Sequence, residues 1–111
     1  MTKNGSKNRV CCKPICAIYG FGSFFVTPEK ANDIDILILH QDISIHSIRF
    51  AIMCKARLAE LLPSAHVTML SNSEESKLAL LKQTKAKYLG EISEATFTEN
   101  LIQTCNNILN R

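Results

Sequence analysis

Short apolar runs alternate along the chain with longer stretches in which apolar residues recur about every 3.6 positions. Residues 15–20 and 34–39 are short, apolar and bounded by turn-forming residues, so each predicts a strand. The second run is nearly continuous, as expected of a central strand covered on both faces. Residues 65–70, between Pro63-Ser64 and Ser71-Asn72-Ser73, predict a third strand.

Helical spacing follows the second strand and fills the C-terminal third. Residues 44–62 form the clearest helix, which Pro63 ends, and Ser73 is the expected N-cap of a second. A last helix is expected after Gly90, from about residue 93 to 110. The predicted apolar positions are, for the first helix, Ile45, Ile48, Ile52, Ala56, Ala59 and Leu62; for the second, Leu78, Leu81 and Tyr88; for the third, Phe97, Leu101, Ile102, Cys105, Ile108 and Leu109.

These elements predict one domain of the α+β (or α/β) class, with helices packed on a small mixed sheet. At 111 residues the chain is long enough to bury about two thirds of the surface that it exposes when unfolded. The polar residues 1–9 predict a flexible tail before a domain at 10–111, with a core at 15–75 and C-terminal helices at 73–111.

Charge and hydropathy limit the partners. A net charge of +3 is too small to indicate a nucleic-acid partner, although residues 3–13 are locally basic. No run approaches the roughly 20 apolar residues that span a bilayer, so no membrane partner is expected.

The five cysteines do not form a metal-binding pattern. Their odd number and the absence of paired C-x-x-C clusters argue against a zinc site. Because secretion is not expected, we predict reduced thiols and a cytoplasmic protein, with Cys54 and Cys105 acting as small apolar residues on helices.

Two aspartates open the most apolar strand. In a strand, residues two apart share a face, so Asp33 and Asp35 should project together. Neighbouring carboxylates repel each other, and a bound cation relieves the repulsion. Mg²⁺ suits this pair because it takes oxygen ligands and often completes its shell with substrate phosphates. A turn residue and a strand-edge ion pair are the alternatives for the two aspartates.

A glycine-serine turn ends the first strand. Gly22 and Ser23 offer backbone N–H groups and a hydroxyl at an expected helix start, and such groups attract phosphate oxygens. The pair and the D-x-D motif together indicate a site for a metal ion and a nucleoside triphosphate.

These motifs give the chain a resemblance to a known family. Residues 15–75, with the strand AIYGFGS, the spacing Gly22-Ser23-x9-Asp33-x-Asp35 and the later strand HVTMLS, resemble the minimal nucleotidyltransferase (MNT-like) domains of the DNA polymerase β-like superfamily. The resemblance implies that Gly22 and Ser23 hold the terminal phosphates and that Asp33 and Asp35 bind Mg²⁺. It also implies attack of an acceptor hydroxyl on the α-phosphate of a nucleoside triphosphate, with release of pyrophosphate.

Two positions depart from the family pattern. The resemblance implies a third carboxylate on the strand beside D-x-D, but the aligned residue is His66, whose imidazole matches Mg²⁺ poorly. Glu74 and Glu75 are the nearest acidic substitutes, and a histidine satisfied by a backbone carbonyl is the structural alternative. Relatives carry Arg-Gly after the serine; here Lys30 is the only basic residue of the loop, so it is the candidate for phosphate binding.

Two functions remain open at the level of sequence. One is an enzyme that transfers AMP from ATP, or another nucleoside monophosphate, to a hydroxyl of a partner protein or small molecule. Small stand-alone relatives modify helical partner toxins, so the resemblance extends to an antitoxin role. The other is a catalytically degenerate nucleotide-binding or partner-binding module that lacks the third carboxylate.

Overall fold

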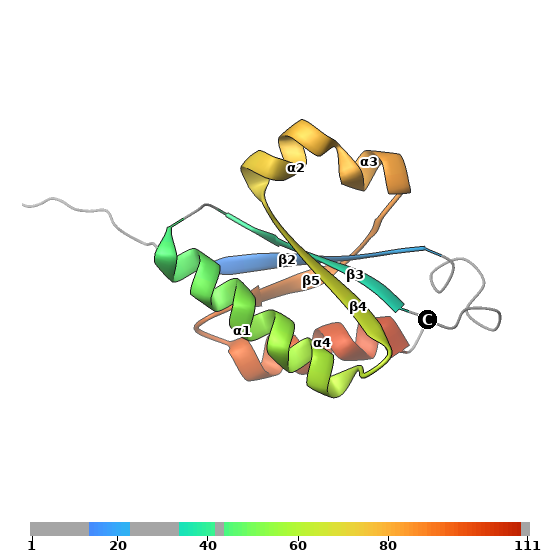
Figure 1. The fold of residues 1–111 in the computed structure, drawn as a ribbon. Helices are drawn as coiled ribbons and strands as arrows, with labels where there is room; N and C mark the ends of the chain where they lie inside the picture. The colour runs from blue at the N-terminus through green and yellow to red at the C-terminus, as the bar shows by residue number, and fades with distance from the viewer. Residues whose placement is uncertain (1–13, 23–33, 42–43, 110–111) are drawn as a thin grey trace, which may run out of the picture.

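The computed structural model describes residues 14–22, 34–41 and 44–109 (Figure 1). The elements within these ranges are β2 (Ile15–Phe21), β3 (Ile34–His40), α1 (Ile45–Leu61), β4 (Ala65–Ser71), α2 (Asn72–Leu78), α3 (Leu80–Thr84), β5 (Lys87–Ser93) and α4 (Phe97–Leu109). The predicted strands at 15–20, 34–39 and 65–70 and the helix at 44–62 are confirmed to within one residue at each end. The expected tail at residues 1–9 lies outside the described residues.

The strands form one mixed sheet in the order β4-β3-β2-β5. β3 pairs in parallel with β4, and β2 is antiparallel to both β3 and β5. Parallel neighbours need a crossover connection, and α1 supplies it between β3 and β4. β2 and β3 are therefore the central strands, as expected for the apolar run of β3.

Helices cover both faces of the sheet. Figure 1 shows α1 and α4 on one side and α2 and α3 on the other. The main core lies under α1 and α4, where Ile18, Ile36 and Ile38 meet Leu58 and Ile108, all fully buried. Leu37 is also fully buried but alternates to the opposite face of β3. The expected α+β class, with helices packed on a small mixed sheet, is confirmed.

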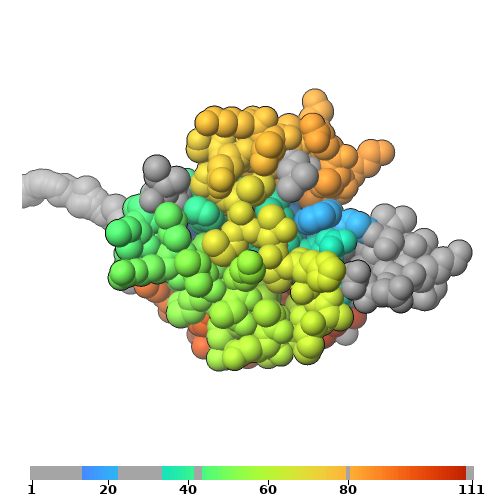
Figure 2. Space-filling view, viewed as in Figure 1, coloured from blue at the N-terminus to red at the C-terminus, as the bar shows by residue number. Residues whose placement is uncertain are grey.

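The face that α1 buries differs from the expected one. Its buried residues are Ser47, Phe50, Ala51, Cys54 and Leu58. The predicted stripe is largely exposed, with Ile45 at 67% and Ile52 at 52%, and only Leu62 at the C-cap is buried. The helix has two apolar stripes, and helical spacing alone does not tell which one faces the sheet. Figure 2 shows the outer surface of α1 beside β4 on the near side of the molecule.

The segment around Tyr88 is a strand, so the prediction that it continues a helix was wrong. β5 pairs with β2 from Gly20↔Lys87 to Ile15↔Ser93, with a bulge opposite Ile18/Tyr19. The bulge places the buried residues Leu89 and Ile92 three positions apart, which imitates helical spacing. α4 then begins at Phe97 and not near residue 93, and its Ile102 and Leu109 are exposed.

The second predicted helix begins earlier and is interrupted. Ser71, not Ser73, is the N-cap of α2, and it forms a reciprocal capping box with Glu74. Ala79, in the left-handed conformation with φ of 50°, then separates α2 from α3. No helix of the described residues is long and apolar enough to cross a membrane.

Candidate functional site

Three strands begin or end at the same end of the sheet, which we call the sheet edge: β2 ends there, and β3 and β4 begin there. β2 ends where its antiparallel partner β3 begins, so Phe21 pairs with Asp35. The parallel strand β4 starts at the same edge, and Asp35 pairs with His66. Gly22, Asp35 and His66 therefore come together from three separate parts of the chain, and we call this group the strand-end site.

Gly22 lies directly against the carboxylate of Asp35. A Cβ built on Gly22 would stand 2.6 Å from Asp35 Oδ2, closer than real side chains approach. The φ of Gly22 is +87°, a conformation that L-residues with a Cβ rarely adopt. Glycine is thus required both by the backbone turn and by the approach of that turn to the carboxylate.

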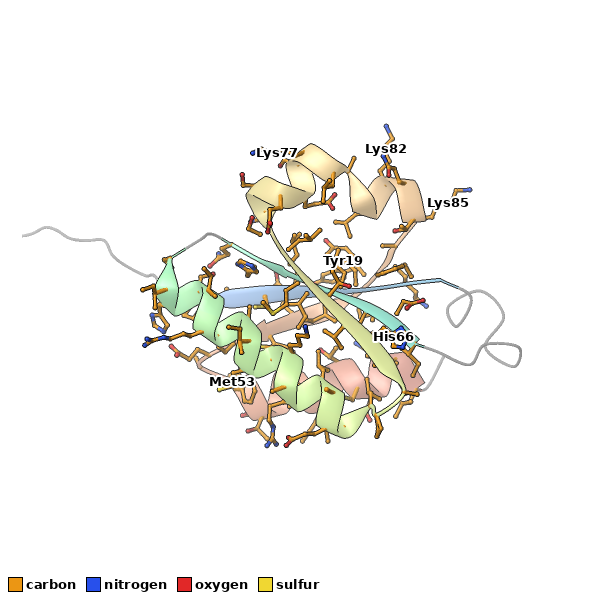
Figure 3. The ribbon with its side chains drawn as sticks, viewed as in Figure 1. Tyr19, Met53, His66, Lys77, Lys82 and Lys85 are labelled. Atoms are coloured by element: carbon orange, nitrogen blue, oxygen red, sulfur yellow. The ribbon has the colours of Figure 1, made fainter. Side chains whose placement is uncertain are left out.

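His66 stands beside Asp35 on the outer strand. The distance from His66 Nδ1 to Asp35 Oδ1 is 3.9 Å, which is too long for a hydrogen bond but short enough for attraction when the imidazole is protonated. The two side chains are 69% and 34% exposed, so solvent reaches both. Figure 3 shows His66 near the start of β4.

Part of the predicted site lies within the described residues. Ser23, Lys30 and Asp33 lie outside the described residues, so their roles stay predictions from the sequence. Of the predicted set, the structure brings together Gly22, Asp35 and His66.

The described side chains fit a divalent cation in part. Asp35 offers a partly exposed carboxylate, the ligand type that Mg²⁺ prefers. The imidazole of His66 is a better ligand for a softer ion such as Mn²⁺ than for Mg²⁺. Within the described ranges there is no group of three His, Cys, Asp or Glu side chains that could hold a metal ion.

Glu74 and Glu75 do not substitute for the third carboxylate. Both follow Ser71, at the end of β4 opposite to His66, roughly 17 Å away at the rise of a strand. The Glu74 carboxylate accepts a hydrogen bond from Ser71 N (2.8 Å), and that of Glu75 from Leu81 N (3.3 Å). Hydrogen bonds to the backbone and side chain of Ser71 lower the pKa of Glu74.

The other histidines lie away from the strand-end site. His46 is exposed on α1 and pairs with Glu94 at 3.2 Å. His40 is buried, with 6% of its surface exposed. It occupies the last position of β3, opposite Ser71.

The described cysteines behave as buried thiols. Cys16, Cys54 and Cys105 are free and buried, as predicted for Cys54 and Cys105. Burial raises the pKa of the Cys105 thiol, and the hydrogen bond with Cys16, together with burial, raises that of Cys54. Both thiols are therefore protonated near neutral pH.

Sequence reasoning missed a cation at the same edge of the sheet. Lys87, the first residue of β5, pairs with Gly20, two residues before Gly22. Exposed lysines precede it in this part of the chain, and Figure 3 shows Lys77 of α2, Lys82 of α3 and Lys85, the residue after α3, projecting outward. The position of Lys87 became visible only with β5, because the sequence pattern had placed this segment on a helix.

Comparisons of the chain with family models, curated proteins and solved structures found no match.

Proposed function

We propose that the protein is a minimal nucleotidyltransferase that transfers AMP from ATP to a hydroxyl of a partner protein or small molecule. One observation carries the proposal: the turn at Gly22 is pressed against the carboxylate of Asp35. A phosphate-binding turn must lie next to the metal-binding carboxylate if both are to hold one triphosphate. The motif spacing adds Ser23 and Asp33 to the same site.

Each residue has a defined task in this proposal. Gly22 and Ser23 bind the terminal phosphates through backbone N–H groups and the serine hydroxyl. Asp33 and Asp35 hold Mg²⁺, which would stabilise the charge that develops on the phosphate oxygens. Lys30 and Lys87 supply positive charge for the same phosphates. The acceptor hydroxyl attacks the α-phosphorus, the α–β phosphoanhydride bond breaks, and pyrophosphate leaves.

In this proposal, a partner protein or a small molecule supplies the acceptor hydroxyl. The described residues next to the strand-end site present no second domain that could hold it. A helical toxin modified by this protein would make it the antitoxin of a toxin-antitoxin pair, as the family resemblance implies.

Transfer of label tests the proposal directly. The protein is incubated with Mg²⁺, α-labelled ATP and candidate acceptors, including the product of an adjacent gene. Asp35→Asn keeps the size of the side chain and should lower transfer at least about a hundredfold, the scale seen when a charge-stabilising group is removed from an active site. Glu99→Gln, on the exposed side of α4, is the matched control and should retain full activity. Equal labelling by both variants would refute the role of Asp35.

His66 favours a second function, a nucleotide-binding or partner-binding module without turnover. It occupies the position next to Asp35 where the resemblance implies a carboxylate. In that case ATP with Mg²⁺ raises the melting temperature, yet no acceptor becomes labelled. His66→Asp separates the two functions. A gain of transfer shows that the natural site is degenerate, whereas a loss shows that the imidazole takes part.

A further inference from the structure

A polar groove runs along the outer edge of β5, away from the strand-end site. It has a volume of about 510 Å³, within the range of small-molecule sites. Its lining includes Tyr88 and Glu91 of β5 and Asn100, Gln103, Thr104 and Asn107 of α4. We call it the β5–α4 groove. β2 lies between β5 and the strand that carries Asp35, so this is a second, separate place on the molecule.

Two asparagines of α4 form hydrogen bonds with backbone groups on the outer edge of β5. Asn100 Oδ1 accepts from Ser93 N (3.0 Å) and from Thr96 Oγ1 (2.7 Å). Asn107 Nδ2 donates to Leu89 O at 2.8 Å. These bonds cap β5 as an edge strand, so they oppose the addition of another strand along its full length. The opening between the two amides suits a compact ligand and not an extended peptide.

The same bonds fix which polar atoms are left for a ligand. Because Asn100 Oδ1 faces the Ser93 N–H, its Nδ2 is a donor without an acceptor among the described residues. Gln103 Nε2 donates to Asn107 Oδ1 at 3.0 Å, which leaves Gln103 Oε1 as an acceptor. The groove therefore presents donors and acceptors of fixed identity from neighbouring turns of α4.

Thr104 supplies an independent sign of a missing partner. Its side chain lines the groove, the residue is only 1% exposed, and its hydroxyl has no hydrogen-bond partner in the part of the chain that the structure describes. A buried hydroxyl without a partner costs about 1–3 kcal/mol, so such groups are rare in native proteins. Gly90 leaves room beside it, since a Cβ there would stand 3.3 Å from Thr104 Oγ1.

The chemistry of the lining selects the ligand class. No lysine or arginine is among the described lining residues, and Glu91 is an anion, so the groove disfavours phosphates and other anions. Carboxamides and hydroxyls match groups that both donate and accept. Tyr88, which is 54% exposed, also lines the groove. We propose that the β5–α4 groove binds a neutral polyhydroxylated ligand, a saccharide, through Asn100, Gln103 and Thr104.

Titration with neutral hexoses tests this proposal. D-glucose, D-galactose and D-mannose are added separately to ¹⁵N-labelled protein, and the side-chain amide signals of Asn100, Gln103 and Asn107 are followed by NMR. At least one sugar should shift these signals in a saturable way. The proposal is overturned if none does, or if inorganic phosphate or ATP shifts them and the sugars do not.

Matched variants locate the binding. Thr104→Val removes the hydroxyl but keeps the shape, and it should weaken sugar binding about three- to tenfold, the value of one hydrogen bond. It breaks no hydrogen bond among the described residues, so its melting temperature should not fall. Thr98→Val, exposed on α4 outside the groove, is the control and should bind like wild type. If Thr104→Val folds poorly, Gln103→Ala replaces it, because Gln103 is exposed. Affinities of both groove variants equal to that of Thr98→Val would refute the site.

Discussion

Replacing Gly22 by alanine perturbs the contact on which the proposed function depends. The φ of +87° costs an alanine about 1–2 kcal/mol, the usual penalty of a left-handed conformation. The added Cβ at 2.6 Å also forces the Asp35 side chain out of its rotamer, at about 0.5–1.5 kcal/mol. The free energy of unfolding should therefore fall by about 1.5–3.5 kcal/mol, out of the 5–15 kcal/mol typical of a domain.

A double-mutant cycle separates the two costs. Shortening Asp35 to alanine removes the carboxylate that the new Cβ would meet but leaves the backbone strain. In the Asp35→Ala background, Gly22→Ala should cost only about 1–2 kcal/mol, so the coupling energy equals the clash of about 0.5–1.5 kcal/mol. Urea unfolding followed by circular dichroism measures all four proteins under the same conditions.

The cycle has a clear failing result. If Gly22→Ala costs the same in both backgrounds, the turn does not touch the carboxylate, and the strand-end site loses its central contact. If Gly22→Ala costs nothing in either background, the left-handed turn itself is wrong.

Three further predictions concern other parts of the molecule. The pKa of Glu74 is lowered in the folded state, so the ionised carboxylate stabilises the protein at pH values above the ordinary pKa of a glutamate. This stabilisation is lost as the pH falls through the pKa of the folded state. Acid unfolding of Glu74→Gln should therefore depend less on pH than that of wild type. Ala79 has a φ of 50°, and the left-handed conformation costs an alanine more free energy than the loss of chain entropy costs a glycine. Ala79→Gly should therefore raise the free energy of unfolding by about 0.5–1 kcal/mol. A lower free energy of unfolding in urea titrations would contradict this. If the protein is an enzyme, the imidazole of His66 should make transfer faster with Mn²⁺ than with Mg²⁺, and His66→Asp should reverse this order in the labelling assay; an unchanged order would exclude His66 as a ligand.

The sequence was sufficient for the central part of the fold. Residues 34–39 are nearly all aliphatic, and burial on both faces follows from that pattern alone. The helix at 44–62 was bounded by recognisable signals, since Ser44 accepts a hydrogen bond from Ser47 N and Pro63 follows the last turn. Such local signals depend on neighbouring residues and can be read without the tertiary structure.

The predictions that were wrong concern features of the fold that tertiary contacts determine. The bulge opposite Ile18/Tyr19 removed the alternation that would have marked β5 as a strand. On α1, Phe50, Ala51 and Cys54 face the core, although the isoleucines form the more regular stripe. Which stripe is buried depends on how the connections after β3 and before β4 direct the helix, and this information is not local.

The candidate site was predictable as a set of motifs but not as a geometry. The spacing of Gly22, Asp35 and His66 along the chain suggested one site, while their pairing at the sheet edge depends on the antiparallel and parallel registers of β3. Lys87 could not be assigned to this edge because β5 itself was not recognised. The Thr104 hydroxyl carries no sequence signal, since its burial without a partner among the described residues is a property of the packed structure.

The strand-end site and the hydrophobic core share no residue. Gly22, Asp35 and His66 stand at strand ends, while the core cluster is formed by the interiors of the strands and by α1 and α4. Substitutions of Asp35 or His66 can therefore change the chemistry of the site without removing an apolar contact of the core, whereas Gly22 is also required by the backbone turn. If the proposed function holds, single substitutions at Asp35 or His66 would convert an enzyme into a binding protein, or the reverse, around an unchanged apolar core.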